Sequence, residues 1–285
     1  MTSKNDLQQL FPQGKLVTKK IDGPGIHVPL ADGSWLVLAD EDLTERERGL
    51  LQLFLPDLSQ EYRHPWACYF QGTGPLPQVL SKLQVIHAHI WTVSDDEGKQ
   101  AWLDMMTKLL PNLQAYYTTN GQDYTFILDR SSLFDVREIL RDTLATMEFD
   151  FGLRMTLFLG QVWPENVVEL WPKLVVAEQS LFSHWRLGHH QSGLLTFSQL
   201  YIWNGPLYPV FRESLGELIV HQQMEKEILA LWQEGAVLTK AAQSLYIHRN
   251  TLQYRLDKWY DWTGLQLKDL TDLAVCYQVI IEDGF

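Results

Sequence analysis

Long apolar stretches are missing from this chain of 285 residues. No run reaches the roughly 18 apolar residues that a membrane-spanning helix requires. The N-terminal sequence MTSKNDLQQLF also lacks the charged and then apolar pattern of a signal peptide. We therefore expect a cytoplasmic protein without a membrane partner.

Cysteine is scarce, and signatures of catalysis are missing. The two cysteines, Cys68 and Cys276, lie far apart among aromatic and aliphatic residues, which suits buried thiols in a reducing compartment. Two cysteines alone cannot form a zinc site, and none of the patterns GxSxG, GxGxxG or GxxxxGKS/T occurs. We expect no disulfide, no metal site, no cofactor, no catalytic residue and no enzymatic activity.

Positive charge is in deficit over the whole chain. Lys and Arg number 23 against 35 Asp and Glu, for a formal charge of −12. This disfavours nonspecific attraction to DNA, because affinity for the duplex comes largely from neutralising phosphates. Between Lys240 and Lys258 the balance is reversed, since four cationic residues stand against one acid, Asp257. Any nucleic-acid contact must therefore use this local positive charge.

This positive segment has the spacing of a helix-turn-helix. The Ala-rich run TKAAQSLYI precedes the run HRNTLQYRL, which spans His248 to Leu256. If Leu238 opens the unit, Ala241 and Ala242 fall where two helices cross closely and only a small side chain fits. The positions that fall on the shared apolar seam are Leu245, Ile247 and Leu252.

The second helix of this unit leaves a polar face outside the seam. Leu252, Leu256 and Trp259 form one apolar stripe at i, i+4 and i+7. A recognition helix places its N-terminal residues against base edges: Arg249 suits a guanine, and Asn250 or Gln253 suits an adenine. Hydroxyl and cationic side chains suit phosphate oxygens. The predicted DNA-binding residues are Thr239, Lys240, His248, Arg249, Asn250, Thr251, Gln253, Tyr254, Arg255 and Lys258.

These residues carry a family resemblance. The stretch from Ile228 to Ile281 resembles the C-terminal DNA-binding domain of PucR/CdaR-type bacterial transcription regulators, whose signature is close to HRNTLRYRL followed by TGL. The TGL segment here is Thr263, Gly264 and Leu265. More distantly, the stretch is similar to the C-terminal module of the nucleoid protein Fis. Gln253 departs from the pattern, because the family usually carries arginine there. The resemblance therefore does not imply a cationic contact at this position.

The middle of the chain alternates between strand and helix patterns. From about residue 63 the order is VIHAHIWTV, KQAWLDMMTKLL, QAYYTT, YTFILD, LFDVREILRDTLATM and LRMTLFLG, followed by a helix around NVVELWPKLVVAEQSLF. This order, βαββαβ and then α, is the ferredoxin-like arrangement of nucleotide cyclase and GGDEF domains. We therefore predict an α+β fold with a ferredoxin-like domain, followed by an all-α helix-turn-helix domain.

These patterns divide the chain into four parts. We predict a small α/β appendage with one hairpin at residues 1–60, a degenerate GGDEF-like domain at 61–185, a helical connector at 186–222 and the PucR-type domain at 223–285. The middle domain's resemblance to the GGDEF-like domain of PucR/CdaR-type regulators rests on topology and position in the chain.

An enzyme is the first alternative. A diguanylate cyclase needs a Gly-Gly hairpin and adjacent carboxylates to hold a divalent metal. The matching hairpin here reads Asn120, Gly121, Gln122, Asp123, which fits an ordinary type I′ turn better. The metal ligands of a retained cyclase or phosphodiesterase would be Asp123 and Asp95, the latter in a loop that fits a helix N-terminus.

Two further interpretations stay open. His87 and His89 face one side of a strand and could bind metal, although a hydrogen-bonded, half-buried face is the commoner explanation. The C-terminal helices could also form an ordinary helical hairpin that serves assembly without DNA.

The first hypothesis is a regulator that binds operator DNA. Two recognition helices about 34 Å apart would read an inverted repeat, which requires at least a homodimer. The domain order and the resemblance add a small-molecule effector that shifts the dimer between arrangements.

Overall fold

The structure is a computed structural model that describes residues 11, 13–17, 26–29, 35–39, 43–44, 47, 64–131 and 135–283. The chain separates into two units, Met1–Arg63 and His64–Phe285. Among the described residues, no helix combines the length and the apolar character that crossing a membrane demands.

The N-terminal unit contains a small antiparallel sheet. Its strands are β1 (Lys15–Val17), β2 (Ile26–Pro29) and β3 (Trp35–Leu38), in the order β1-β3-β2. The pairing of β2 with β3 agrees with the predicted hairpin. The expected turn at Asp32 and Gly33 lies outside the described residues.

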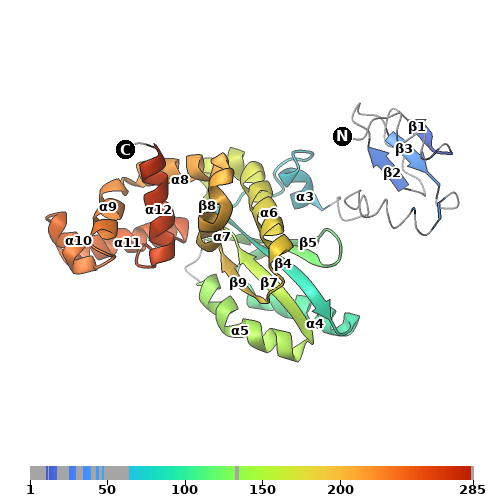
Figure 1. Ribbon diagram of the computed structural model, residues 1–285, viewed down its shortest axis with the longest axis horizontal. Coiled ribbons are helices and arrows are strands. Elements are labelled where there is room, and N and C mark those ends of the chain that lie inside the picture. The colour runs from blue at the N-terminus through green and yellow to red at the C-terminus, as the bar shows by residue number, and fades with distance from the viewer. Residues whose placement is uncertain are drawn as a thin grey trace. The chain divides into compact units, whose positions relative to one another are not determined.

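The second unit is built on a mixed sheet whose first four strands follow the predicted order (Figure 1). The elements from its start are α3 (Pro65–Phe70), β4 (Lys82–Val93), α4 (Asp96–Leu109), β5 (Leu113–Thr118), β6 (Asp123–Asp129), α5 (Val136–Asp150) and β7 (Leu153–Leu159). The strands β5-β6-β4-β7 lie side by side and are antiparallel throughout. This is the ferredoxin-like topology, so the βαββαβ prediction is confirmed.

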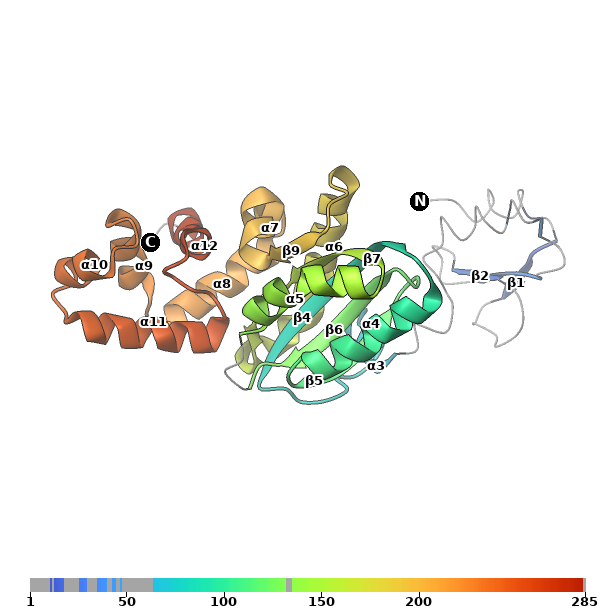
Figure 2. The ribbon, with the colours of Figure 1, turned by 90° about the horizontal axis from the view of Figure 1, so that it is seen from below.

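Alternation along β4 gives the sheet two buried faces. Ile86, Ala88 and Ile90 belong to one apolar cluster, together with side chains of α4 and α5. His87 points to the opposite face, where its ring stacks on Phe158, and helix α6 (Trp171–Gly188) covers this face. Figure 2 shows α4 and α5 together on their side of the sheet.

The segment that follows β7 adds a strand that the sequence patterns did not reveal. After β8 (Trp163–Pro164) and the 3-10 turn η3 (Glu165–Leu170), helix α6 begins at Trp171, with Pro172 in its first turn, where proline is tolerated. Strand β9 (Gly193–Thr196) then pairs in parallel with β7. The predicted helical connector therefore also contributes to the sheet.

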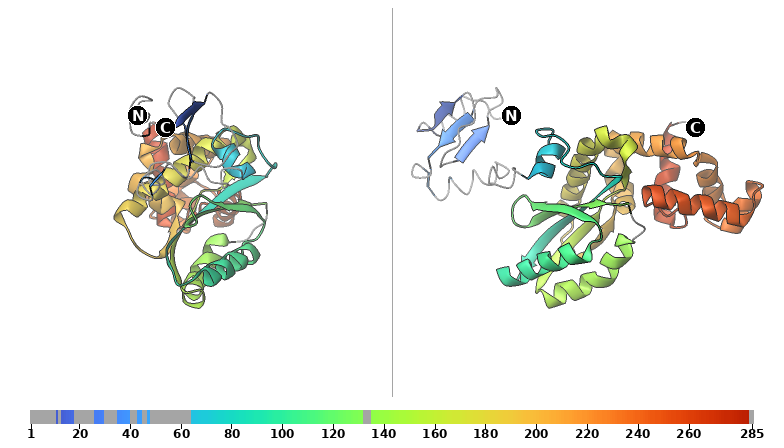
Figure 3. Two further views of the ribbon diagram at one scale, coloured as in Figure 1. Left: turned by 90° about the vertical axis from the view of Figure 1, so that its right-hand side faces the viewer. Right: turned by 180° about the vertical axis from the view of Figure 1, so that it is seen from behind.

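Helices make up the C-terminal part, coloured from yellow-orange to red in Figure 3. They are α7 (Phe197–Asn204), η4 (Gly205–Leu207), α8 (Pro209–Gln222), α9 (Glu225–Gln233), α10 (Leu238–Ser244), α11 (Arg249–Thr263) and α12 (Leu270–Asp283). Helix α12 packs against α7, α8 and α9. One apolar cluster extends from Trp171 of α6, through Phe211 and Leu215 of α8, to Leu256 of α11 and Leu273 of α12.

Candidate nucleic-acid interface

Helices α10 and α11 form the predicted helix-turn-helix. Ala241 and Ala242 are buried at the crossing, and Leu252, Leu256 and Trp259 of α11 are buried as well. Leu245 and Ile247, in the turn, pack partly buried against the same cluster. The seam inferred from spacing is therefore present, and it fixes which face of α11 points outward.

The turn between the two helices contains a residue in a left-handed conformation. Tyr246 has φ of 55° and is 96% exposed. Its backbone N–H donates to Gln243 O, and the next N–H, of Ile247, donates to Ala242 O, which closes α10. A side chain in this region costs roughly 1–2 kcal/mol. No feature of the sequence indicates this conformation, because glycine is its usual marker.

The ten predicted DNA-binding residues lie on or beside α10 and α11. Nine of them are exposed, and Gln253 is half-buried. Thr239 and Lys240 are in the first turn of α10, and the other eight run from the start of α11 to Lys258. The structure shows that they are accessible, and their contact with DNA stays a prediction.

His248 has a structural task at the start of α11. It is the N-cap residue, and its Nδ1 accepts a hydrogen bond from Asn250 N at 3.2 Å. A side-chain acceptor at this position satisfies one of the unpaired N–H groups of the first turn. Only Nε2 of the ring is left for a DNA contact.

Gln253 is bound by two neighbours within the domain. Its Nε2 donates to Asp257 Oδ1, and its Oε1 accepts from Lys268 Nζ at 2.6 Å. A bidentate contact with adenine needs the same two groups, so it would require both hydrogen bonds to exchange. Lys268, in the loop before α12, is exposed and adds a cation that the sequence analysis did not include.

Arg255 is paired with a buried carboxylate. Its guanidinium donates from Nη1 to Oε1 of Glu227, a residue of α9. The sequence analysis assigned Arg255 to phosphate only and did not identify Glu227. Their separation of 28 positions hides the pair from any local pattern.

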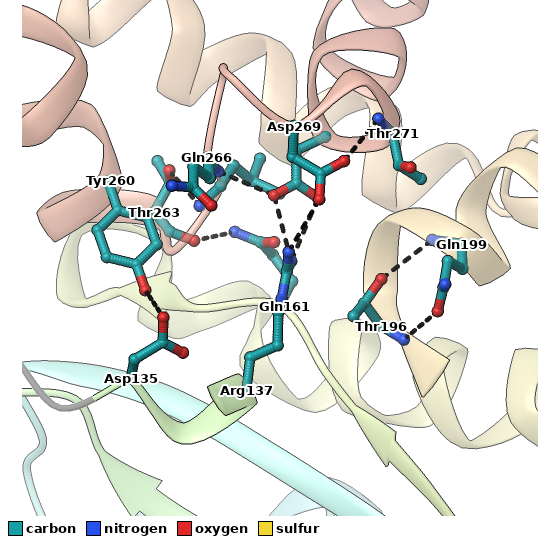
Figure 4. Close-up of polar contacts among 12 residues, drawn as sticks. Asp135, Arg137, Gln161, Thr196, Gln199, Tyr260, Thr263, Gln266, Asp269 and Thr271 are labelled. Atoms are coloured by element: carbon teal, nitrogen blue, oxygen red, sulfur yellow. Dashed lines mark hydrogen bonds and ion pairs between the residues drawn. The ribbon is translucent and has the colours of Figure 1, made fainter. Parts of the chain in front are cut away.

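The C-terminal end of α11 is bound to the sheet region by polar contacts (Figure 4). The Tyr260 hydroxyl donates to Asp135 Oδ2 at 3.0 Å, and Asp135 Oδ1 accepts from Glu138 N, which caps α5. The amide of Gln161 donates to the carbonyl of Thr263. Burial, with the charge of Asp135 and the hydrogen bond to it, raises the pKa of Tyr260 to about 12.

We call the contacts between the C-terminal end of α11 and the sheet region the joint. A glycine and a cluster of ion pairs also belong to it. Gly264 ends α11 with φ of 71°, and a Cβ there would lie 2.8 Å from Val162 Cγ2. This explains the glycine of the TGL segment. Arg137 of α5 lies 3.4 Å from Asp269 and 3.2 Å from the buried Asp272 of α12. The joint thus fixes α11 and α12 against the sheet region.

Asp95 and Asp123, the metal ligands of the enzyme hypothesis, have other partners. Asp95 caps α4, because its Oδ1 accepts from Gly98 N at 2.6 Å. Asp123 Oδ1 lies 2.6 Å from His89 Nδ1 and 2.6 Å from Arg186 Nη1. Burial alone would raise the pKa of Asp123, but the hydrogen bond with His89 and the charge of Arg186 outweigh it and lower the pKa. Both groups therefore have structural explanations.

The histidine pair considered for metal binding and the hairpin of the enzyme hypothesis also have structural partners. His87 lies 3.7 Å from Glu178 of α6, and His89 pairs with Asp123, as expected for a partly buried polar face. At the hairpin, Asn120 Oδ1 accepts from the N–H groups of Gln122 and Asp123. Only Gly121 of the Asn-Gly pair has a positive φ, so the structural turn differs from the expected type I′ geometry, which needs two.

Three known proteins are similar to this chain in sequence or in structure. The chain is similar to a leucine-rich protein of Streptococcus dysgalactiae subsp. equisimilis, at 28% identity over 97% of this chain and 99% of the relative. It is also similar to the uncharacterized protein YxkF of Bacillus subtilis (strain 168), at 20% identity over 87% and 88%. A solved regulator of polyketide synthase expression from Bifidobacterium adolescentis matches with a TM-score of 0.41 and 15% identity, over 82% of this chain and 96% of that one. This last likeness is too distant to carry an argument.

The family comparison concerns the site itself. Residues 228–278 match the family described as the PucR C-terminal helix-turn-helix domain. The matched segment runs from α9 to α12 and contains both helices of the motif. The segment from α9 to α12 is therefore similar to the PucR C-terminal helix-turn-helix domain.

Proposed function

We propose that this protein is a transcription regulator that binds a specific DNA sequence through α11. The observation that carries the proposal is the packing of α10 and α11 on small and apolar residues, which leaves Arg249, Asn250 and Tyr254 exposed on one recognition helix. The family match at residues 228–278 supports it independently. Side chains at the N-terminal end of a recognition helix read base edges in the major groove.

We further propose that the regulator acts as a homodimer on an inverted repeat. One α11 covers a short half-site, and two-fold symmetry places a second helix one helical turn of DNA away, about 34 Å. The acidic chain, with its formal charge of −12, limits nonspecific binding, so two helices would be needed for tight binding at physiological salt.

Selection of bound oligonucleotides from a random pool tests the proposal. We expect a two-fold symmetric sequence to be enriched, and Arg249→Ala to lose about 1–3 kcal/mol of preference at one base position of each half-site. Arg141→Ala is the matched control, because it removes the same charge from an exposed position on α5. Failure to enrich any sequence would favour the assembly hypothesis, in which α10 and α11 contact protein instead.

The proposed response to an effector is supported by a cavity in the sheet region. It has a volume of about 150 Å³ and lies between α6 and the strands β4 and β6, with His87, Thr125, Phe182, Ser183 and Arg186 among its lining residues. Its lining combines an aromatic ring with hydrogen-bonding groups, as small-molecule sites do. A metabolite that binds there should raise the melting temperature of the wild type but not of Ser183→Phe, which fills the cavity from its exposed edge.

A further inference from the structure

Glu227 of α9 is a charged residue whose side chain is buried, at a cost in free energy. Its side chain is 3% exposed, and Oε2 has no hydrogen-bond partner among the described residues. A buried carboxylate without a cation is strongly unfavourable in a protein interior. Arg255 supplies the cation, because its Nη1 donates to Oε1 of Glu227. The folded domain therefore keeps these two groups together.

The pairing leaves most of the arginine available. The side chain of Arg255 is 50% exposed, although one of its nitrogens is engaged with Glu227. A guanidinium has five N–H donors in one plane, so a fixed partner for one nitrogen restricts the orientation of the others. The donors that face solvent are thus held in a defined direction before any ligand arrives.

The place of Arg255 on α11 indicates what that ligand is. Thr251, Arg255 and Lys258 follow one another at i, i+4 and i+7, and all three are exposed. They form one stripe beside the outward face that carries Asn250 and Tyr254. Hydroxyl and cationic groups flanking the base-reading face of a recognition helix suit the phosphates that border the groove.

We propose that Glu227 is a positioning residue for DNA binding, which holds the guanidinium of Arg255 in the orientation that contacts a backbone phosphate. The inference rests on the proposed function and adds a residue of α9 that does not itself touch DNA. Its benefit is entropic, because a long side chain that is ordered before binding loses less freedom when it binds.

Glu227→Gln tests the proposal, since it keeps the volume of the side chain and removes its charge. Binding is measured on a mixed-sequence duplex and on a duplex selected by the wild type, each over a range of salt concentrations. We expect Glu227→Gln to weaken binding to both duplexes by about two- to tenfold, as the ordering of one long side chain predicts. The salt slope should stay the same, because Arg255 still neutralises its phosphate.

Glu225→Gln is the matched control, because it removes the same charge from the first turn of the same helix. The loss of a negative charge near DNA should leave its affinity equal or slightly higher. The two variants are thus expected to differ in the direction of their effect, which a general electrostatic explanation cannot produce.

Arg255→Lys provides a second measurement that does not depend on the folding of Glu227→Gln. Lysine keeps the charge that neutralises Glu227 but lacks the planar fork. We expect weaker binding with the salt slope unchanged, and no further loss when Glu227→Gln is added to Arg255→Lys. Melting temperatures of all variants show that each is folded at the temperature of the binding assay.

The outcomes separate the two proposals. If the wild type binds both duplexes and Glu227→Gln matches Glu225→Gln, the positioning role is refuted and the DNA-binding function stands. Additive losses from Glu227→Gln and Arg255→Lys would refute it equally. If the wild type selects no duplex and does not bind the mixed-sequence duplex, the proposed function fails, and the positioning role fails with it.

Discussion

The hydroxyl of Tyr260 offers a direct measurement of the joint between α11 and the sheet region. Tyr260→Phe removes the donor to Asp135 Oδ2 and keeps the ring. The pKa of Tyr260 is raised to about 12, first by burial and then by Asp135, so only part of this rise reports the hydrogen bond. A hydrogen bond to a charged group contributes about 1.5–3 kcal/mol. Tyr260 is half-buried and Asp135 is exposed, so solvent screening reduces the expected value to about 1 kcal/mol.

The dependence of this contribution on pH has a defined sign. Because the folded state holds the Tyr260 proton more tightly than the unfolded state, the stabilisation is complete below pH 10 and is lost as the pH rises toward 12. Urea denaturation of the wild type and Tyr260→Phe at several pH values measures it. We expect a difference of about 1 kcal/mol in the free energy of unfolding at pH 8, shrinking above pH 10.

Tyr254→Phe is the control for this measurement, because it removes an exposed hydroxyl from the same helix. It should leave the free energy of unfolding within about 0.5 kcal/mol of the wild type at every pH. A difference for Tyr260→Phe that is absent at pH 8 would refute the contribution of this bond to stability, and one that stays constant through pH 11 would refute the raised pKa of Tyr260.

Three further predictions concern other parts of the chain. Ala241→Leu, at the buried crossing of α10 and α11, should lower the free energy of unfolding by about 1–3 kcal/mol in urea titrations, whereas the exposed Gln243→Leu should not. Tyr246→Gly should raise the urea midpoint by the equivalent of about 0.5 kcal/mol, because relief of the left-handed strain exceeds the added freedom of the unfolded chain. The lowered pKa of Asp123 means that its stabilisation is present above the unfolded value of 3.8 and is lost as the pH falls below it. Acid titration should therefore reveal a loss of stability in the wild type that is smaller in Asp123→Asn.

The parts of the fold that depend on regular spacing could be predicted from the sequence. The strands around His87 and Phe126 alternate between faces, and the helix-turn-helix combines small residues at Ala241 and Ala242 with an apolar stripe. Strand β9 was missed because GLLT is only four residues long and carries no alternating polar pattern. Its position depends on pairing with β7, which no local pattern encodes.

The candidate site was predicted in outline, and its internal contacts were not. Exposure of Arg249 and Asn250 follows from helical periodicity, which the sequence displays directly. The partners of Gln253 and Arg255 come from Lys268 and Glu227, on other elements, so they depend on tertiary packing. The left-handed Tyr246 likewise has no marker in the sequence, since tyrosine is uncommon there.

The apolar cluster that continues from α6 into the C-terminal helices has a practical consequence for dissection of the protein. A fragment containing only residues 223–285 would remove α7 and α8 from α12, whose Leu273 and Cys276 belong to the shared apolar cluster. Such a fragment should self-associate or unfold, whatever its affinity for an operator. A soluble truncation should therefore begin at His64, because the apolar cluster continues from α6 through α7 and α8 into α12.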